Sequence, residues 1–347
     1  MTLGPLMVDL RGHVLESDER EMLQHPLVGS VILFTRNYRD PEQLTQLVSA
    51  IHAARHPALV VAVDHEGGRV QRFRSGFSAL PPLRAIGHAY DIAPQSGLDL
   101  ARQMGWLMAA ELRSHGVDLS FAPCVDLDYG VSSVIGDRAL HARSASVGAL
   151  AVAYMHGMRG AGMAATAKHF PGHGAVVADS HLALPVDRRS LVDLSEDMAP
   201  YRVLIANGLP AVMVAHVLFP EIDELPASFS ARWIQNVLRG ELRFQGVVFA
   251  DDLSMEGAVA VGDIVHRAEL ALAAGCDVLP VCNQPASVAA LLDRLKIIDD
   301  PAAQFRRVRL RGRLPLTRAE LLASAPWQSA QDALARISAA PTFNLQA

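Results

Sequence analysis

The segment from Lys168 to Pro185 carries the densest group of residues able to do acid–base chemistry. It reads KHFPGHGAVVADSHLALP and combines three histidines and an aspartate with two glycines and two prolines. Histidine changes its charge between pH 5 and 8, which suits it to accept and donate protons during a reaction. A segment of this length without helical or strand periodicity is typical of a loop that binds or covers a ligand. We therefore expect a functional loop, in which Gly172 and Gly174 permit backbone turns.

Two further patterns place carboxylates where such chemistry needs them. Asp179 and His181 are two residues apart, so in an extended chain both side chains project to one face, where the carboxylate orients the imidazole and favours its charged form. Without further context, this pair is more typical of a capped loop histidine than of a catalytic pair. Asp251 and Asp252 stand at the end of an apolar run. If the strand continues, they point to opposite sides, and this alternation does not say which one faces a substrate.

The elements that must position these residues are eight short apolar or β-branched runs. They are Pro5 to Asp9, Ser30 to Phe34, Leu59 to Asp64, Leu119 to Pro123, Ala164 to His169, Ala211 to His216, Gly246 to Asp251 and Asp277 to Val281. Several are almost continuously apolar, as parallel strands covered on both faces are. Ionisable residues stand at the ends of several runs. A barrel without a function would rarely place such residues there, because they would partly face its core.

Helical segments lie between these runs and agree with a repeating β/α unit. Asp40 is an expected N-cap before Pro41, and the segment Asp263 to Ala274 ends at Gly275. The sequence therefore predicts an α/β fold, a single (β/α)₈ TIM barrel, with its active site at the carboxyl ends of the strands. A doubly wound open sheet is the alternative, and no G-x-G-x-x-G after the first run supports it.

We expect the barrel and C-terminal helices to occupy residues 1–340 as one catalytic domain, with Thr317 capping one of those helices. Residues 341–347 are expected to form a loose tail. The chain has 347 residues, half of them hydrophobic and 19% charged, which supports one large buried core.

The composition also bears on partners and location. The net charge of −5 argues against a nucleic-acid or anionic-membrane partner. The longest apolar stretch, Val203 to Phe219, is interrupted by polar residues and a proline, and the N-terminus lacks the pattern of a secretory signal, so we expect a cytoplasmic protein. The three cysteines, at 124, 276 and 282, are not spaced like a disulfide framework or a zinc site, and no metal or other cofactor is expected.

Four motifs taken together resemble one enzyme family. DHEGGRVQRF, KHFPGHG, DSH and FADDLSM follow one another between residues 64 and 257. This order resembles the family 3 glycoside hydrolases, in particular the bacterial cytosolic β-N-acetylhexosaminidases of peptidoglycan recycling. The resemblance implies a retaining β-N-acetylglucosaminidase that releases terminal N-acetylglucosamine from muropeptides built on N-acetylglucosaminyl-1,4-anhydro-N-acetylmuramic acid. Those relatives are single barrels, whereas many β-glucosidases of the family need a second domain for which this chain is too short.

The resemblance also implies roles for individual residues. Asp251, the first aspartate of FADD, matches the nucleophile that forms the covalent glycosyl-enzyme. His181 matches the proton donor and acceptor, and Asp179 matches the residue that orients it. The positions that match sugar-binding residues are Asp64, Arg72, Arg138, Lys168 and His169.

Some of these residues also have a purely structural interpretation. The alternative is a structural salt-bridge network among Asp64, Arg69, Arg72 and Asp137, and for Arg69 and Asp137 we prefer it. Asp252 is expected to be structural. Two positions depart from the family pattern: His65 stands where glutamine is common, and Ala250 where serine is common. Both departures concern fine specificity, because neither removes a catalytic group.

Other functions remain to be weighed against this one. A metal-dependent barrel hydrolase would assemble ligands from His169, His173, Asp179, His181 and His216. A non-catalytic sugar sensor would keep the hydroxyl-binding residues and lose the catalytic pair, which this sequence retains. A β-glucosidase-type activity and phosphorolysis in place of hydrolysis are the remaining alternatives. The sequence does not determine the oligomeric state, and a monomer is compatible with it.

Overall fold

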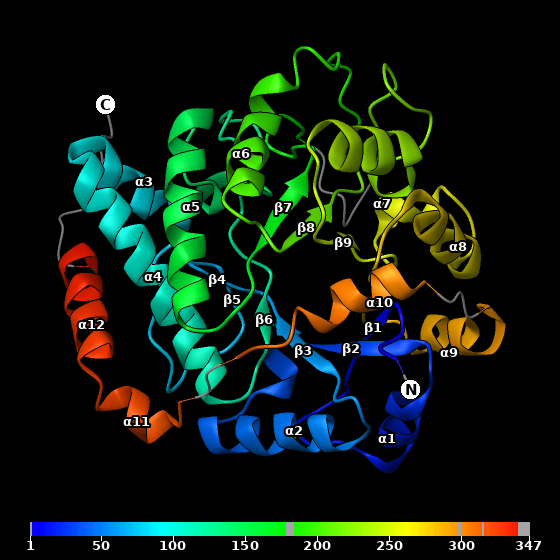
Figure 1. Ribbon diagram of the computed structural model, residues 1–347, viewed down its shortest axis with the longest axis horizontal. Helices are drawn as coiled ribbons and strands as arrows, with labels where there is room; N and C mark the ends of the chain where they lie inside the picture. The colour runs from blue at the N-terminus through cyan, green and yellow to red at the C-terminus, as the bar shows by residue number, and fades with distance from the viewer. Residues whose placement is uncertain (1, 178–183, 297–299, 314–315, 339–347) are drawn as a thin grey trace.

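The computed structural model describes residues 2–177, 184–296, 300–313 and 316–338, and within them eight parallel strands surround one core (Figure 1). The strands are β1 (Leu6–Asp9), β2 (Val28–Leu33), β3 (Val60–Val63), β6 (Leu119–Ser120), β7 (Thr166–Phe170), β8 (Ala211–Val214), β9 (Val247–Ala250) and β10 (Leu279–Val281). Each coincides with one of the eight predicted runs, although β2 begins two residues earlier than predicted.

The strands follow one another around a ring, which confirms the predicted barrel. Backbone ladders join β10, β1, β2, β3 and β6 in that order, and a second ladder joins β7, β8 and β9. Isolated parallel bridges connect the two ladders, at Leu119 with Ala164 between β6 and β7, and at Phe249 with Val278 between β9 and β10. An open sheet would leave two edge strands here, so the doubly wound alternative is wrong.

Helices cover the outside of this ring, as each strand's apolar outer face requires. They are α1 (Ser17–Gln24), α2 (Pro41–Ala53), α3 (Leu83–Ile92), α4 (Pro94–Ser114), α5 (Ser144–Gly160), α6 (Ser195–Ala206), α7 (Glu256–Val259), α8 (Ile264–Ala274), α9 (Pro285–Arg294), α10 (Pro301–Val308), α11 (Arg318–Leu322) and α12 (Ala325–Ser338). Short 3₁₀ turns at Thr35–Asn37, Gly136–Arg138 and Ala227–Phe229 and a π-helix at Arg232–Glu241 complete the regular structure.

The predicted helix signals are confirmed at their ends. The Asp40 carboxylate accepts a hydrogen bond from the Gln43 N–H at 2.8 Å, with Pro41 in the first turn of α2. Asp263 caps α8 in the same way, and Gly275 ends that helix with φ at +111°. Thr317 forms a capping box at the start of α11. Helices α11 and α12 lie beside α4, away from the centre of the ring (Figure 1).

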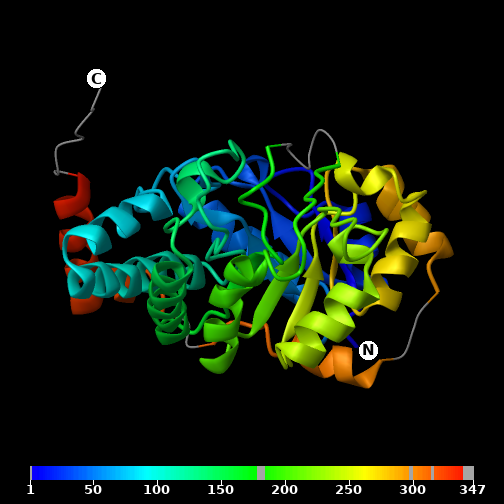
Figure 2. The same ribbon diagram turned by 90° about the horizontal axis from the view of Figure 1, so that it is seen from above.

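The loops after the strands gather at one edge of the molecule. In Figure 2 the loops that follow β6 and β7 lie along the upper edge, while α10 lies along the lower edge. A small hairpin, β4 (His65–Gly67) with β5 (Val70–Gln71), follows β3. Gly67 has φ at +107°, and a Cβ there would lie 2.3 Å from the Pro81 carbonyl oxygen, so only glycine fits this turn. Among the described residues, no helix is long and apolar enough to cross a membrane.

Candidate active site

A pocket of about 610 Å³ lies at the carboxyl ends of the strands, where the barrel prediction places the active site. Its apolar wall includes Phe34, Phe121, Met213 and Met255. The charged and polar residues that line it include Asp64, Glu66, Arg69, Arg72, Arg138, Lys168, His169, His173, Asp251 and Asp252. The nucleophile candidate and all five predicted sugar-binding residues therefore share one cavity. Asp179 and His181 lie outside the described residues.

A buried cluster of alternating charges forms one side of this pocket. The Lys168 ammonium contacts Glu66 at 2.6 Å and Asp64 at 2.9 Å, and it comes from β7 while both carboxylates follow β3. Arg138 approaches from the loop after β6 and pairs with Glu66 through two hydrogen bonds of 2.8 and 2.9 Å. Arg72 lies 3.6 Å from the other carboxylate oxygen of Asp64. The cluster thus joins residues more than 100 positions apart.

Glu66 is the central member of this cluster, and the sequence interpretation did not include it. It is only 2% exposed and bridges the two cations that were predicted to bind sugar. The spacing could have indicated it, because Asp64 and Glu66 are two residues apart and in an extended segment such residues share a face. The orientation of Arg138 and Lys168 therefore depends on a carboxylate that holds both cations.

Electrostatics keep every member of the cluster charged. Burial opposes ionisation of Glu66, but Arg138 and Lys168 outweigh it and hold the pKa of that carboxyl below its usual range. For Asp64 burial is likewise the largest effect, and Lys168 and Arg72 reverse it, so its pKa is also lowered. For Lys168, burial lowers the pKa, but Asp64 and Glu66 raise it by more, so the pKa of this ammonium group is raised. The pocket therefore presents fixed hydrogen-bond donors and acceptors suited to vicinal hydroxyl groups.

Asp251 and Asp252 both line the pocket, although the sequence predicted opposite sides for them if the strand continued. The strand β9 ends at Ala250, so the alternation of an extended strand no longer applies at the next two residues. Asp251 is anchored to the barrel by its own N–H, which donates to the Val214 carbonyl at 3.0 Å.

Asp252 has the structural surroundings that were predicted for it. Its carboxylate accepts hydrogen bonds from the Ser254 N–H, the Ser254 hydroxyl and the Cys282 N–H, at 3.0, 2.6 and 3.1 Å. Burial nevertheless raises the pKa of Asp252 to about 6. A carboxylate held by three donors is well placed to fix the loop after β9, and Asp251 with it.

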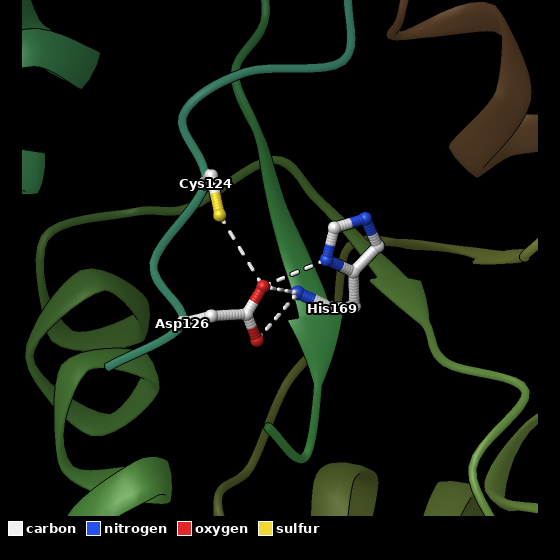
Figure 3. Close-up of side chains that lie close together, drawn as sticks. All are labelled: Cys124, Asp126 and His169. Atoms are coloured by element: carbon white, nitrogen blue, oxygen red, sulfur yellow. Dashed lines mark hydrogen bonds and ion pairs between the residues drawn. The ribbon is translucent and has the colours of Figure 1, made fainter. Parts of the chain in front are cut away.

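His169 is held in position by a buried aspartate from the neighbouring strand end. Asp126 accepts a 2.7 Å hydrogen bond from the His169 ring Nδ1 and further bonds from the backbone N–H of His169 (Figure 3). It also accepts a bond from the His173 N–H at 2.8 Å. The Cys124 thiol donates to the same carboxylate at 3.2 Å. The sequence interpretation did not include Asp126, although it follows the fourth strand as the other site residues follow theirs.

Cys124, Asp126 and His169 also form a group with ligand atoms close enough to hold a metal ion (Figure 3). Their hydrogen bonds favour a structural role: burial raises the pKa of the Cys124 thiol well above its usual value, and both Asp126 oxygens already accept N–H donors. We predict that turnover survives exhaustive dialysis against a chelator. A loss of activity that zinc restores would instead indicate a catalytic metal.

Several other predicted residues lie away from the pocket. His65 is buried against Phe73 and Phe77 and is not among the described residues that line the cavity. His216 is a satisfied core histidine: its ring bonds the Ser228 hydroxyl at 2.6 Å and the Asp252 carbonyl at 2.9 Å.

The expected salt-bridge network separates into two pairs. Arg69 lies 3.4 Å from Asp137, and about half of each side chain is exposed, which fits the structural role we preferred for this pair. Arg72 pairs with Asp64 inside the pocket. Arg69 also lines the outer part of the cavity and donates to the Ser133 carbonyl at 3.0 Å.

Similarity to known proteins extends over the whole barrel. A β-hexosaminidase of Thioalkalivibrio sulfidiphilus is 52% identical over 345 residues, which covers 99% of both chains. A β-hexosaminidase of Thiobacillus denitrificans is 54% identical over 313 residues, covering 90% of this chain and 87% of the relative. The crystal structure of NagZ from Neisseria gonorrhoeae in complex with N-trifluoroacetyl-D-glucosamine is 41% identical, with a TM-score of 0.92 and coverage of 98% and 99%.

The family assignment agrees with the fold and the pocket. Residues 6–309, from the first strand of the barrel to the end of α10, match the glycosyl hydrolase family 3 N-terminal domain. That match covers far more than half of the chain. The chain therefore belongs to glycosyl hydrolase family 3.

Proposed function

We propose that this protein is a retaining β-N-acetylglucosaminidase, with Asp251 as the nucleophile. The observation that carries the proposal is that Asp251 shares one pocket with the buried Lys168, Glu66 and Arg138 cluster. Glycoside hydrolysis needs a carboxylate beside the anomeric carbon, and in a retaining enzyme that carboxylate forms the covalent intermediate. Fixed charged groups opposite it would hold the sugar hydroxyls, so that C1 meets the Asp251 oxygen.

The second catalytic group in this proposal is His181, oriented by Asp179. Support comes from the DSH motif and from the preceding described residues, because Lys168, His169 and His173 all line the pocket. An imidazolium donates a proton to the leaving oxygen, and the resulting imidazole then takes a proton from the water that releases the sugar. A carboxylate hydrogen-bonded to the ring favours the charged form needed in the first step.

The proposed substrates are muropeptides with a terminal N-acetylglucosamine linked to 1,4-anhydro-N-acetylmuramic acid, hydrolysed in the cytoplasm during peptidoglycan recycling. The named β-hexosaminidase relatives and the N-trifluoroacetyl-D-glucosamine complex of the Neisseria protein support an N-acylated sugar in this pocket. We propose no metal or other cofactor and no nucleic-acid or membrane partner for this reaction.

A direct comparison of two aryl glycosides tests this function. The protein should hydrolyse an aryl β-N-acetylglucosaminide with a kcat/KM at least about tenfold above that for the matching β-glucoside, the discrimination one well-placed polar contact supplies. The released sugar should be the β-anomer by NMR, as retention requires. Faster turnover of the glucoside would favour a β-glucosidase-type enzyme. Binding of the sugar without turnover would favour a sugar sensor. A rate that depends on added phosphate would indicate phosphorolysis.

Replacing His181 by alanine should affect substrates according to their leaving groups. Loss of the proton donor should slow a disaccharide, whose leaving oxygen needs protonation, by about 10²- to 10⁴-fold. An activated nitrophenyl glycoside should lose much less in the glycosylation step, because its leaving group departs as an anion. Pre-steady-state and steady-state rates with both substrates would measure this, and equal losses would contradict the acid/base role.

His173 is a further candidate for substrate contact. It is 2% exposed and lines the pocket, yet neither ring nitrogen has a hydrogen-bond partner among the described residues. Burial lowers the pKa of His173, so its ring is neutral near pH 7 and offers one donor and one acceptor. Leaving both nitrogens unpaired costs free energy, and a polar group of the substrate that reaches either of them would recover part of this cost.

We predict that His173→Leu reduces kcat/KM for the aryl N-acetylglucosaminide by about tenfold to a hundredfold, because a hydrogen bond to the sugar is lost. The melting temperature should stay equal or rise, since the substitution removes two unpaired buried nitrogens. His216→Leu is the matched control, because that histidine's ring is fully hydrogen-bonded and its loss should lower the melting temperature. A His173→Leu protein with unchanged kinetics would contradict the contact.

A further inference from the structure

A second cavity, of about 650 Å³, opens at the end of the barrel opposite the active site. It lies at the amino ends of β7, β8 and β9, where α10 and the segment after it cross the barrel on its lower side in Figure 2. Six arginines contribute to its lining: Arg159, Arg243, Arg306, Arg309, Arg311 and Arg313. No aspartate or glutamate is among the described residues that line it. Because the whole chain carries 36 acidic and 31 basic residues, this lining reverses the overall charge balance.

Three of these arginines come from residues 309–313, which we call the arginine strap. Arg309, Arg311 and Arg313 are exposed, while Leu310 between them is buried. The strap is tied to the turn before β7, because the Arg313 N–H donates to the Gly162 carbonyl at 2.8 Å. Because Leu310 is buried and the three arginines are exposed, this fixed backbone places three guanidinium groups along one rim of the cavity.

The protein itself neutralises only one of the six arginines within its described residues. Arg306 pairs with Asp277 at 2.7 Å. No described carboxylate forms an ion pair with Arg159, Arg243, or the three arginines of the strap. Like charges gathered around a concave surface strengthen the local positive potential, and such a potential concentrates anions. Five of the six arginines thus have no carboxylate partner among the described residues, and an anionic ligand would supply the negative charge.

The remaining lining gives the ligand a second property. Ala164, Ile205 and Pro210 line the cavity and are partly exposed, so they contribute an apolar wall beside the guanidinium groups. A concavity of this volume falls in the range of small-molecule sites, which favours a small ligand over the surface of a membrane or a nucleic acid. Guanidinium groups bind phosphate oxygens through paired hydrogen bonds, and they also stack on flat aromatic rings.

We propose that this cavity binds a small polyphosphate anion that carries a flat apolar group, that is, a nucleoside triphosphate or a ligand of the same chemistry. The phosphates would lie among the strap arginines with Arg159 and Arg243, and the apolar group would lie against Ile205 and Pro210. The site is separate from the sugar pocket, which shares none of these lining residues.

The test is isothermal titration calorimetry of the full chain with ATP, without added metal, in about 0.15 M salt, conditions under which surface charges are largely screened. ATP should bind saturably at one site, and adenosine should not bind measurably. The double variant Arg311→Glu with Arg313→Glu should weaken ATP binding at least tenfold. The matched control changes two exposed arginines elsewhere, Arg20→Glu with Arg202→Glu, for the same change in net charge, and should bind ATP as the wild type does.

Several results would overturn the proposal. They are no saturable ATP binding by the wild type, equal weakening in the two double variants, adenosine binding as tight as that of ATP, and displacement of ATP by N-acetylglucosamine, which would place the anion in the sugar pocket. Hydrolysis of the aryl glycoside should be the same in both double variants and the wild type. That activity verifies that the variants are folded, because none of the four arginines belongs to the proposed catalytic site.

Discussion

Replacing Asp251 by asparagine should reduce turnover of an aryl β-N-acetylglucosaminide by about 10⁴-fold, the scale of loss when one member of a catalytic set is removed. The amide has nearly the shape of the carboxylate, but it cannot form a stable glycosyl ester or offset the positive charge that develops at C1. Binding of N-acetylglucosamine should persist, because Lys168, Asp64 and Arg138 remain in place. Rates and calorimetric affinities measured on one preparation would separate these two effects.

Asp252→Asn is the matched control, since it makes the same chemical change at the adjacent residue. Asp252 accepts bonds from Ser254 and Cys282, so its replacement should loosen the loop and lower kcat by far less than loss of Asp251. A mass-spectrometric adduct formed with a 2-fluoro glycosyl donor should appear on Asp251. An adduct on Asp252, or the larger rate loss in its variant, would reverse the assignment.

Replacing Glu66 by glutamine should have the largest effect on stability, about 3 kcal/mol less free energy of unfolding. Glu66 contacts Lys168 at 2.6 Å and Arg138 at 2.8 Å while almost fully buried, and removing one member of a buried ion pair leaves the other charge uncompensated. Because Arg138 and Lys168 would lose their fixed orientation, KM for the glycoside should rise more than kcat falls. Chemical denaturation and steady-state kinetics would measure the two effects.

The pH dependence of this variant has a definite sign. The folded-state pKa of Glu66 lies below its ordinary value of 4.5, so its ionisation stabilises the protein fully above that pH. That contribution is lost as the pH falls from about 4.5 through the lower folded-state pKa. The difference in unfolding free energy between wild type and Glu66→Gln should therefore shrink between pH 6 and pH 3.

Asp137→Asn provides the control for Glu66→Gln, because its partner Arg69 and its own side chain are both about half exposed. An exposed ion pair contributes between about 0 and 1 kcal/mol, so this variant should remain close to the wild type at every pH. An equal loss of stability in Asp137→Asn and Glu66→Gln would contradict this prediction. It would show that burial does not determine how much the charged cluster contributes to the free energy of unfolding.

Much of the architecture could be predicted from the sequence, because strands and helices depend on nearby residues. Continuous apolar runs indicated all eight strands, and caps such as Asp40 and Thr317 indicated where helices begin. The carboxyl ends of those strands then gathered Asp64, Lys168 and Asp251 at one end of the barrel. The motifs of the family supplied the candidate roles, including those of Asp179 and His181, which stay predictions.

The tertiary structure decided what the side chains at those strand ends do. Local alternation does not apply to Asp251 and Asp252, because β9 stops at Ala250, and both residues line the pocket. Glu66 and Asp126 gained their roles only through partners 72 and 43 positions away. Sequence spacing determines which residues stand at a strand's end, but ionisation and orientation depend on burial and on charges brought close by folding, which one strand does not contain.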